Sequence, residues 1–260
     1  MSPPEGPLAG RVALVTGGGR GIGRAIVLAL AADGADVAVN YRRDADAATD
    51  TVTAVEELGR RARAYQASVD SLDDDRALAE AVLADFGHVD ILVHNAGIAS
   101  RGATVVDTDP TELERVVRTH ALGPHHLCQA LVPQMRTRPR GDVVFISSVA
   151  TLTMAANGGP YNMAKAAMEA LALTLAREER AHGIRVNIVA PGLVDTTMGQ
   201  RLMRAVAGVE DLRTLDPVMP FGRVCRPSDV AEVVRWLVSD GAGYVTGQKI
   251  NVDGLASSAR

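Results

Sequence analysis

Two residues on one predicted helix have the types and spacing for proton exchange with a substrate. Tyr161 and Lys165 are four positions apart, which places both side chains on the same helical face. A phenol has a pKa near about 10 and is a poor acid at neutral pH, but a neighbouring ammonium favours the phenolate and lowers that pKa. The pair therefore predicts general acid–base chemistry on an oxygen atom. A tyrosine and a surface lysine also reach this spacing by chance, so the pair alone leaves both interpretations open.

A second feature is the glycine-rich segment Thr16–Gly23, which follows the apolar run Val12–Val15 and precedes a predicted helix. Glycine can turn the chain with positive φ and lets a pyrophosphate approach the backbone without a Cβ in the way. The N-terminus of the following helix offers free N–H groups and partial positive charge to phosphate oxygens. The segment therefore predicts a dinucleotide site. The residues that we expect to contact the cofactor here are Gly17, Gly19, Arg20, Gly21, Ile22 and Gly23.

Arginines stand where an NAD site would have an acidic residue. In the common dinucleotide fold, an Asp or Glu at the end of the second strand binds the ribose 2′-hydroxyl. Here the run Asp36–Asn40 is followed by Tyr41 and Arg42, and Arg20 lies near the same ribose edge. Guanidinium groups bind a 2′-phosphate through charge-assisted, forked hydrogen bonds. We therefore expect NADP(H) to be preferred, while the nearby Asp44 keeps NAD(H) open.

The elements that carry these residues alternate between short apolar runs and longer, Ala-rich charged stretches. Near-continuous apolar runs suit strands covered on both faces, and the alternation predicts parallel strands joined by right-handed crossover helices. We therefore predict an α/β fold, a Rossmann-type doubly wound sheet of about seven parallel strands with helices on both faces. The expected strands include Val12–Val15, Val37–Val39, Ile91–Val93, Val143–Ile146 and Ile184–Val189. The expected helices cover Gly21–Asp33, Ala45–Gly59, Leu72–Phe86, Thr111–Met135, Gly159–His182 and Ser228–Ser239.

The domain organisation is expected to be simple. Residues 1–10, with three prolines and two glycines, predict a flexible lead-in, and residues 11–260 predict one dinucleotide-binding catalytic domain. A long irregular stretch, Gly192–Pro227, follows a predicted strand end, where open α/β sheets bind their ligands. Irregular segments of this length are usually lids or binding segments. We expect a substrate lid over about residues 193–227, with helical turns around Met198–Ala207; a disordered excursion is the alternative.

Composition excludes several function classes. The 260 residues carry 27 basic and 31 acidic side chains, so no basic excess exists to neutralise nucleic acid or an acidic membrane surface. The longest apolar run, Ala25–Ala32, falls short of the about 18 residues that a membrane helix needs. Two cysteines, Cys128 and Cys225, cannot form a disulfide framework, and His125, His126 and Cys128 point around a helix rather than along one face. We expect a cytoplasmic protein with no nucleic-acid, membrane or metal partner.

The motifs together resemble the classical branch of the short-chain dehydrogenase/reductase family. The G-x-x-x-G-x-G spacing over residues 17–23 is similar to the cofactor turn of that family, and Tyr161 with Lys165 matches its Y-x-x-x-K motif. The family places its catalytic serine thirteen residues before the tyrosine, which is the position of Ser148. The resemblance covers about residues 9–254, and the chain looks most like 3-oxoacyl-(acyl-carrier-protein) reductases.

The resemblance implies hydride transfer between a nicotinamide and a carbonyl carbon. It implies that Tyr161 supplies the proton to the oxygen, that Ser148 stabilises negative charge there, and that Lys165 holds the nicotinamide ribose. Strand alternation points either Ser147 or Ser148 away from the site, and the family spacing selects Ser148. The further cofactor contacts that the resemblance implies are Ser68, Val69, Asn95, Ala96, Gly97, Tyr161, Lys165, Pro191, Gly192, Val194 and Thr196.

One position departs from the family pattern. The family usually has Asn-x-x-Gly where this chain has His120 and Gly123, and the family asparagine helps to hold a water that returns a proton to the lysine. An imidazole can hold a water and can exchange protons near neutral pH. We therefore count His120 among the catalytic residues and predict a working relay with altered pH dependence. The alternative is that His120 is only a packed helix residue and that the relay is weakened.

These observations predict an NADP(H)-dependent oxidoreductase that interconverts a ketone and a secondary alcohol, and the resemblance favours 3-oxoacyl thioesters. One alternative is an NAD(H)-dependent dehydrogenase of a sugar, a steroid or another small alcohol. An epimerase or dehydratase is another, but such relatives usually have longer substrate domains. A non-catalytic nucleotide sensor is disfavoured by the complete set of Ser148, Tyr161 and Lys165. The resemblance also implies a homotetramer.

Overall fold

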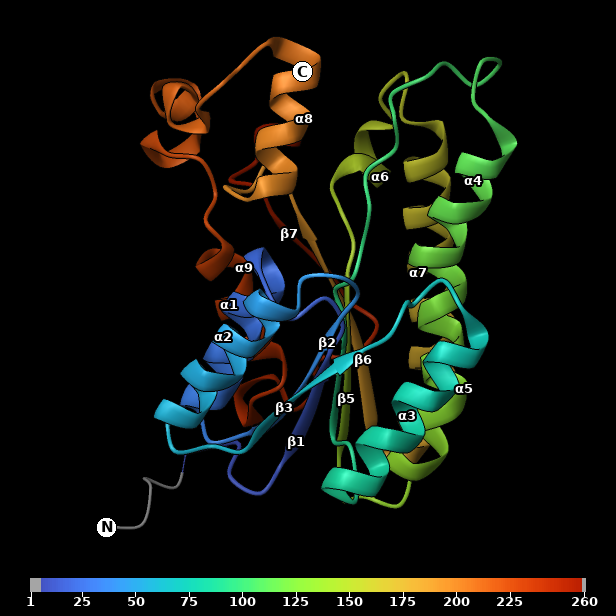
Figure 1. Cartoon of the computed structure of the whole chain (residues 1–260), viewed down its shortest axis with the longest axis vertical. Helices are drawn as coiled ribbons and strands as arrows, with labels where there is room; N and C mark the ends of the chain where they lie inside the picture. Colours follow the sequence, from blue (N-terminus) through green and yellow to red (C-terminus); the bar gives the residue numbers. More distant parts are fainter. Residues whose placement is uncertain (1–5, 259–260) are drawn as a thin grey trace.

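A computed structural model describes residues 6–258 of the chain, and its centre is one sheet of seven parallel strands. The strands lie in the order β3-β2-β1-β4-β5-β6-β7, because the chain crosses from β3 back past β1 and forms β4 beside it. Figure 1 shows the sheet between two layers of helices. This confirms the predicted doubly wound sheet. The strands are β1 (Val12–Val15), β2 (Asp36–Tyr41), β3 (Ala62–Gln66), β4 (Ile91–His94), β5 (Gly141–Ile146), β6 (Ile184–Pro191) and β7 (Lys249–Val252).

Helices cover both faces of this sheet, as predicted. One layer contains α1 (Gly21–Ala32), α2 (Ala45–Glu57) and α9 (Pro227–Leu237). The other contains α3 (Leu72–Phe86), α4 (Pro110–Val117), α5 (Gly123–Met135) and α7 (Gly159–Glu179).

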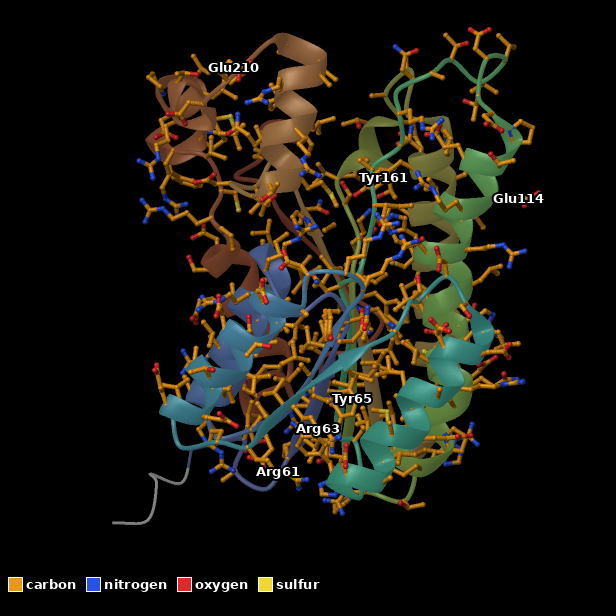
Figure 2. All side chains as sticks on the ribbon, viewed as in Figure 1. Arg61, Arg63, Tyr65, Glu114, Tyr161 and Glu210 are labelled. Carbon is orange, nitrogen blue, oxygen red and sulfur yellow. The ribbon has the colours of Figure 1, made fainter. Side chains whose placement is uncertain are left out.

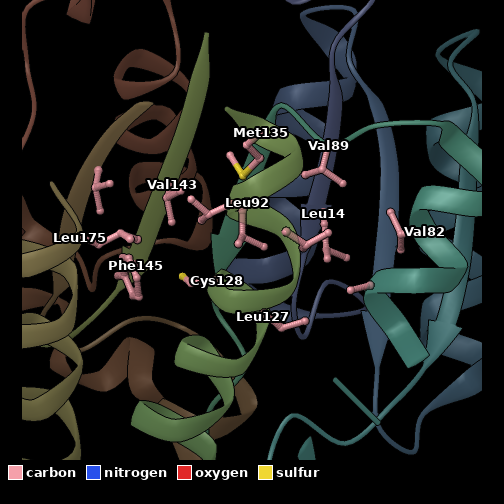
Figure 3. Packing of buried hydrophobic residues seen from close by; sticks show 14 of the residues in the cluster. Leu14, Val82, Val89, Leu92, Leu127, Cys128, Met135, Val143, Phe145 and Leu175 are labelled. Atoms are coloured by element: carbon pink, nitrogen blue, oxygen red, sulfur yellow. The ribbon is translucent and has the colours of Figure 1, made fainter. Parts of the chain in front are cut away.

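Each face of the sheet has its own apolar core because successive strand residues point to opposite sides. Leu14, Phe145 and Leu127 of α5 belong to the apolar cluster on one face (Figure 3). Val15, the next residue of β1, belongs to the cluster on the other face together with Ile26 of α1. Burial on both sides explains why the strands were readable as continuous apolar runs.

The long helix predicted over Thr111–Met135 is wrong in one respect, since a wider turn interrupts it. Between α4 and α5 the chain forms a π-helical turn, η1 (Arg118–Leu122), and the helix continues from Gly123. Pro124 has no backbone N–H to donate to the carbonyl of His120, four residues earlier, so the α-helical ladder is broken there. Such turns inside α-helices are frequent at functional sites. His120 lies on this one.

The segment predicted as a lid has its own helices. It contains α8 (Thr197–Ala207), followed by the short helical turns η3 (Leu212–Val218) and η4 (Pro220–Gly222). Figure 1 shows α8 above the ends of the strands, across from the short helix α6 (Ala150–Thr153). The helical turns predicted around Met198–Ala207 therefore appear as α8.

The predicted lead-in is anchored at one point. Residues 1–5 lie outside the described part of the chain, but Leu8 is buried, and its backbone N–H donates to the carbonyl of Asp33 at 2.8 Å. Residues 6–10 therefore pack against the domain instead of extending from it. Over residues 6–258, we find no helix that combines the length and the apolarity needed to cross a bilayer.

Candidate active site

Strand β5 and helix α7 bring the predicted catalytic residues together. Ser148 follows β5 by two residues, and Tyr161 lies on the first turn of α7, at the end of the sheet where α6 and α8 rise (Figure 2). The Ser148 side chain hydrogen-bonds the phenol of Tyr161. The neighbouring Ser147 donates instead to Oε1 of Glu169 at 2.5 Å. Alternation along the chain therefore presents Ser148, and not Ser147, to Tyr161.

Lys165 is buried one helical turn after Tyr161. Its Nζ donates to the carbonyl of Ile146 at 2.7 Å and lies 5.7 Å from the centre of the Tyr161 ring. Burial lowers the pKa of Lys165 to about 7, and the charge of Glu169 acts in the opposite direction. The lysine therefore changes its protonation state near neutral pH, which suits a group that passes protons.

The expected lowering of the Tyr161 pKa by Lys165 is wrong for this arrangement. Burial raises the pKa of Tyr161, and the hydrogen bond from Ser148 opposes that rise only in part. The lysine does not reverse the direction because its Nζ is turned toward the Ile146 carbonyl and its own charge is disfavoured by burial. Tyr161 is thus protonated at neutral pH, in the state that a proton donor requires.

His120 lies against Tyr161, as the π-helical turn allows. Its Nε2 lies 2.8 Å from the carbonyl of Ile98 and 3.2 Å from the backbone N–H of the same residue, so Nε2 donates to the first in one tautomer and accepts from the second in the other. Nδ1 is buried without a partner. The ring meets that of Tyr161 edge-on with 5.3 Å between centres. Gly97 makes room, because a Cβ there would lie 2.6 Å from Cε1 of His120.

The predicted pH dependence through His120 is also wrong. Burial and the positive charge of Lys165 lower the pKa of His120 to about 3, so the imidazole stays neutral throughout the neutral range. Desolvation explains this, since His120 is almost fully buried. His120 is therefore left with a role that does not depend on titration: a neutral ring with one donor and one acceptor nitrogen, held in place by Ile98.

Replacing His120 distinguishes a titrating imidazole from a neutral side chain that only forms hydrogen bonds. We expect His120→Asn to change kcat by less than about tenfold and to leave the pH profile in place, because the asparagine amide still offers an acceptor and no titrating group is lost. His120→Leu removes the acceptor and should lower kcat by about 10- to 100-fold. The measurement is the steady-state rate of wild type, His120→Asn and His120→Leu as a function of pH. A pH profile displaced in His120→Asn would show that the imidazole does titrate.

The glycine turn has the geometry of a phosphate cradle. Gly17 and Gly21 have backbone φ angles of +62° and +55°, which residues other than glycine rarely adopt. A Cβ on Gly23 would lie 2.1 Å from the carbonyl oxygen of Gly17. Asn95 fastens the turn, because its Nδ2 donates to the carbonyls of Thr16 at 2.9 Å and Gly17 at 3.1 Å. Asn95 therefore shapes the turn from behind, as its place after β4 suggested.

The turn borders an open cavity that is also lined by residues of α8. The cavity has a volume of about 580 Å³ and is lined by Gly21, Asp195, Thr196, Thr197, Gln200, Arg201 and Arg204. Arg20, which precedes α1, makes no capping side-chain bond, and no acidic residue occupies the first turn of that helix. Free N–H groups and glycine backbone thus fit a diphosphate. Thr196 stands over Gly21, with its Cγ2 3.4 Å from where a Cβ would be.

The residues predicted at the ribose end are close together but loosely paired. Arg20 lies 3.6 Å from a carboxylate oxygen of Asp44, and Arg42 lies 3.7 Å from one of Asp70. Exposed pairs at such distances contribute little, so both guanidinium groups are free to turn to a ligand. Ser68 donates its hydroxyl proton to Asp70 at 2.5 Å, so this donor is already engaged within the chain.

The other predicted cofactor residues lie at the ends of the same strands. Gly192 follows β6, and its N–H donates to the carbonyl of Val252 at 3.1 Å; Val194 is buried. Val69 follows β3 and lies so close to α5 that a Cβ on Gly123 would clash with its carbonyl. The remaining predicted residues also lie at this edge of the sheet: Tyr41 and Pro191 end β2 and β6, Ala96 and Gly97 follow β4, and Gly19 and Ile22 lie between β1 and the end of the first turn of α1.

Sequence reasoning missed two features of the site. It did not find the hydrogen-bonded cluster of Ser147 and Glu169, although Glu169 follows Lys165 by one helical turn. It also missed the π-helical turn, for which Gly123 and Pro124 were the available signal. Within residues 6–258 no group of three or more His, Cys, Asp or Glu side chains could hold a metal ion, and Cys128 is a buried free thiol.

Comparison with known proteins agrees with this geometry. A family model described as enoyl-(acyl carrier protein) reductase matches residues 17–254. The 3-oxoacyl-(acyl-carrier-protein) reductase FabG of Staphylococcus aureus (strain Mu50) is 36% identical over 242 residues, which cover 93% of this chain and 96% of that protein.

Two solved structures are also similar along almost their whole length. A short-chain dehydrogenase from Burkholderia cenocepacia J2315 in complex with NADP has a TM-score of 0.86 and 35% identity, covering 97% of this chain and 100% of that one. Carveol dehydrogenase from Mycobacterium avium in complex with NAD has a TM-score of 0.88 and 28% identity, covering 96% and 98%. With a family model and relatives matched over nearly all of its length, the chain belongs to the short-chain dehydrogenase/reductase family of NAD(P)-dependent oxidoreductases, which act on CH–OH and carbonyl groups.

Proposed function

We propose that the protein is an NADP(H)-dependent reductase that interconverts a ketone and a secondary alcohol, with 3-oxoacyl thioesters as its substrates. One observation carries the proposal: the protonated phenol of Tyr161, with Ser148 beside it, stands at the sheet edge where the glycine turn opens. The similarity to a 3-oxoacyl-(acyl-carrier-protein) reductase supports this substrate class. The proposal includes a lid over about residues 193–227 and a cytoplasmic homotetramer.

The residues of the chain divide the work of the reaction. A nicotinamide bound along the strand ends supplies the hydride. Ser148 is placed to donate a hydrogen bond to the substrate oxygen and to stabilise the negative charge that develops on it. Tyr161 gives its proton to that oxygen, and the burial that raises the pKa of Tyr161 keeps the proton in place until then. Lys165, with a pKa of about 7, is suited to return a proton to Tyr161.

The preference for NADP(H) is tested at Arg42 and at Asp44, the carboxylate that faces Arg20. We expect Arg42→Ala to weaken NADPH binding by about tenfold or more, because a charge-assisted contact to the 2′-phosphate is lost. Binding of NADH should change by less than about twofold, since it has no 2′-phosphate. Asp44→Ala is the companion variant and should tighten NADPH binding, because it removes the carboxylate that faces Arg20. Fluorescence titration of both cofactors measures this. Equal losses for the two cofactors would contradict the proposal.

A second candidate substrate is a bulky apolar alcohol or ketone. Exposed apolar side chains rise on both sides of the site: Leu152 and Met154 beside α6, and Met198 and Leu202 on α8. Val105 adds to the first side, because it packs over Gly159 at the start of α7. The similarity to carveol dehydrogenase favours the same class. Apolar surface of this kind is typical of a binding site for an apolar ligand.

One experiment separates these functions. The purified protein is incubated with NADPH and a panel of 3-oxoacyl thioesters, cyclic ketones and sugars, and nicotinamide absorbance is followed. Preferred turnover of 3-oxoacyl thioesters is the expected result. Preferred turnover of cyclic ketones would transfer the assignment to the second candidate. Binding of NADPH with no turnover of any substrate would overturn both and favour a sensor.

A further inference from the structure

A carboxylate outside the described catalytic set lies one helical turn beyond Lys165. Tyr161, Lys165 and Glu169 follow one another at intervals of four residues and therefore share a face of α7. The Glu169 carboxylate accepts hydrogen bonds from the hydroxyl of Thr151 at 2.9 Å and from Nζ of Lys249 at 2.9 Å and 3.0 Å. Together with the bond from Ser147, this cluster joins four elements: β5, α6, α7 and β7.

The cluster holds the end of β5 against α7. Lys165 binds the carbonyl of Ile146, and Glu169 binds the hydroxyl of the next residue, Ser147. The single hydroxyl proton of Thr151 is shared between two acceptors, Oε1 of Glu169 and the carbonyl of Ser148, both 2.9 Å away. The helix that carries Tyr161 thus holds the residues immediately before Ser148, while Thr151 holds Ser148 itself. The position of the Ser148 hydroxyl relative to the phenol depends on these bonds.

The use of lysine in this chain singles out the same place. Of the 27 basic side chains, 25 are arginines and only Lys165 and Lys249 are lysines. Lys165 lies one turn before Glu169, and Lys249 pairs with it directly, although they come from α7 and β7. An ammonium is a compact charge that changes its pKa readily when buried, whereas a guanidinium stays charged. Lys165 and Lys249 are therefore the basic side chains of this set whose charge burial can remove, and both lie close to Glu169.

We propose that Glu169, held by Lys249 and Thr151, is a positioning residue of the reaction: it fixes the Ser148 end of β5 against α7 and sets a negative charge one turn from Lys165. This proposal rests on the proposed function for its kinetic consequences, but its structural part does not need turnover. Lys249 has a separate role: its ammonium balances the negative charge of Glu169, whose carboxylate is only partly exposed to water.

The charge of Glu169 has a predictable effect on Lys165. Glu169 raises the pKa of Lys165 against the effect of burial. On its other sides the ammonium faces the carbonyl of Ile146, the neutral ring of His120 and the phenol of Tyr161. Removing the charge of Glu169 therefore leaves burial unopposed, and the lysine should lose its proton at a lower pH.

The first test reads this titration directly. Lysine-selective ¹³C labelling gives two Cε signals, because the chain has two lysines, and Lys249→Arg assigns them. In the wild type the Lys165 signal should titrate with a pKa of about 7. In Glu169→Gln we expect the midpoint to fall by about one unit. An unchanged midpoint would overturn the proposal. Since no substrate is needed, a wild type that reduces nothing would refute the proposed function and leave this result standing.

The second test uses the enzyme with cofactor and substrate. Glu169→Gln keeps the side-chain volume and should lower kcat by about tenfold, with KM and the NADPH dissociation constant changed by less than about twofold. The rate profile should shift to lower pH with the lysine. Glu169→Asp, which restores the charge, should recover the profile. Glu178→Gln, on an exposed position of the same helix, is the matched control and should behave as wild type. A lower melting temperature with an unmoved pH profile would show a merely structural role and refute the proposal.

Discussion

Replacing Tyr161 with phenylalanine is expected to lower kcat for ketone reduction by about 10³- to 10⁴-fold, the upper range for loss of a general acid. The phenol is protonated because burial raises its pKa, and it lies beside the side chain of Ser148. Phenylalanine keeps the ring that packs edge-on against His120, so the fold should remain. Steady-state kinetics with NADPH and fluorescence titration of NADPH binding give the two readouts. Binding should be unchanged.

A second tyrosine provides the matched control. Tyr65 lies on β3, well away from Tyr161 in Figure 2, and its hydroxyl donates to Asp85 at 2.6 Å. Tyr65→Phe also removes one buried hydroxyl, and we expect it to cost stability without affecting kcat. If Tyr161→Phe retained more than about a tenth of the turnover, another group would have to protonate the substrate oxygen. Ser148 would then be the first candidate.

Local patterns made much of this site predictable. Tyr161 and Lys165 are related by one helical turn, and the glycine turn is a continuous segment, so their spacing is visible in the sequence. Burial on both faces made strands such as Val143–Ile146 readable as apolar runs. The π-helical turn could also have been found, because Pro124 cannot donate to the carbonyl of His120. It was missed because the apolar periodicity continues through it.

Protonation states were not predictable in the same way. The sequence shows that Lys165 is near Tyr161, but the direction of each pKa depends on how deeply the fold buries both groups. The neutral state of His120 follows from tertiary packing against Gly97. The bond between Glu169 and Lys249 joins residues 80 positions apart and exists only because β7 lies beside β6 in the sheet. Such contacts require the strand order.

At the opposite end of β5 from Ser148, another buried carboxylate holds the sheet together. Asp142 is buried and lies 2.7 Å from Arg11, 3.0 Å from Arg140 and 2.6 Å from Arg185. These arginines precede β1, precede β5 and lie on β6, so one carboxylate ties three strands. Arg140 also reaches Asp240, an almost fully exposed residue, at 2.5 Å. The same guanidinium therefore has one buried and one exposed partner.

Asp142→Ala is expected to lower the free energy of unfolding by about 3–5 kcal/mol, because breaking a buried ionic cluster leaves uncompensated charge in a poorly solvated place. Asp240→Ala, which removes the exposed partner of Arg140, should cost less than about 1 kcal/mol. Urea unfolding of both variants measures the difference. NADPH affinity of folded Asp142→Ala should equal that of wild type, since the glycine turn lies at the other end of the sheet. Equal losses in the two variants would mean that water reaches the Asp142 cluster and that burial does not set its strength.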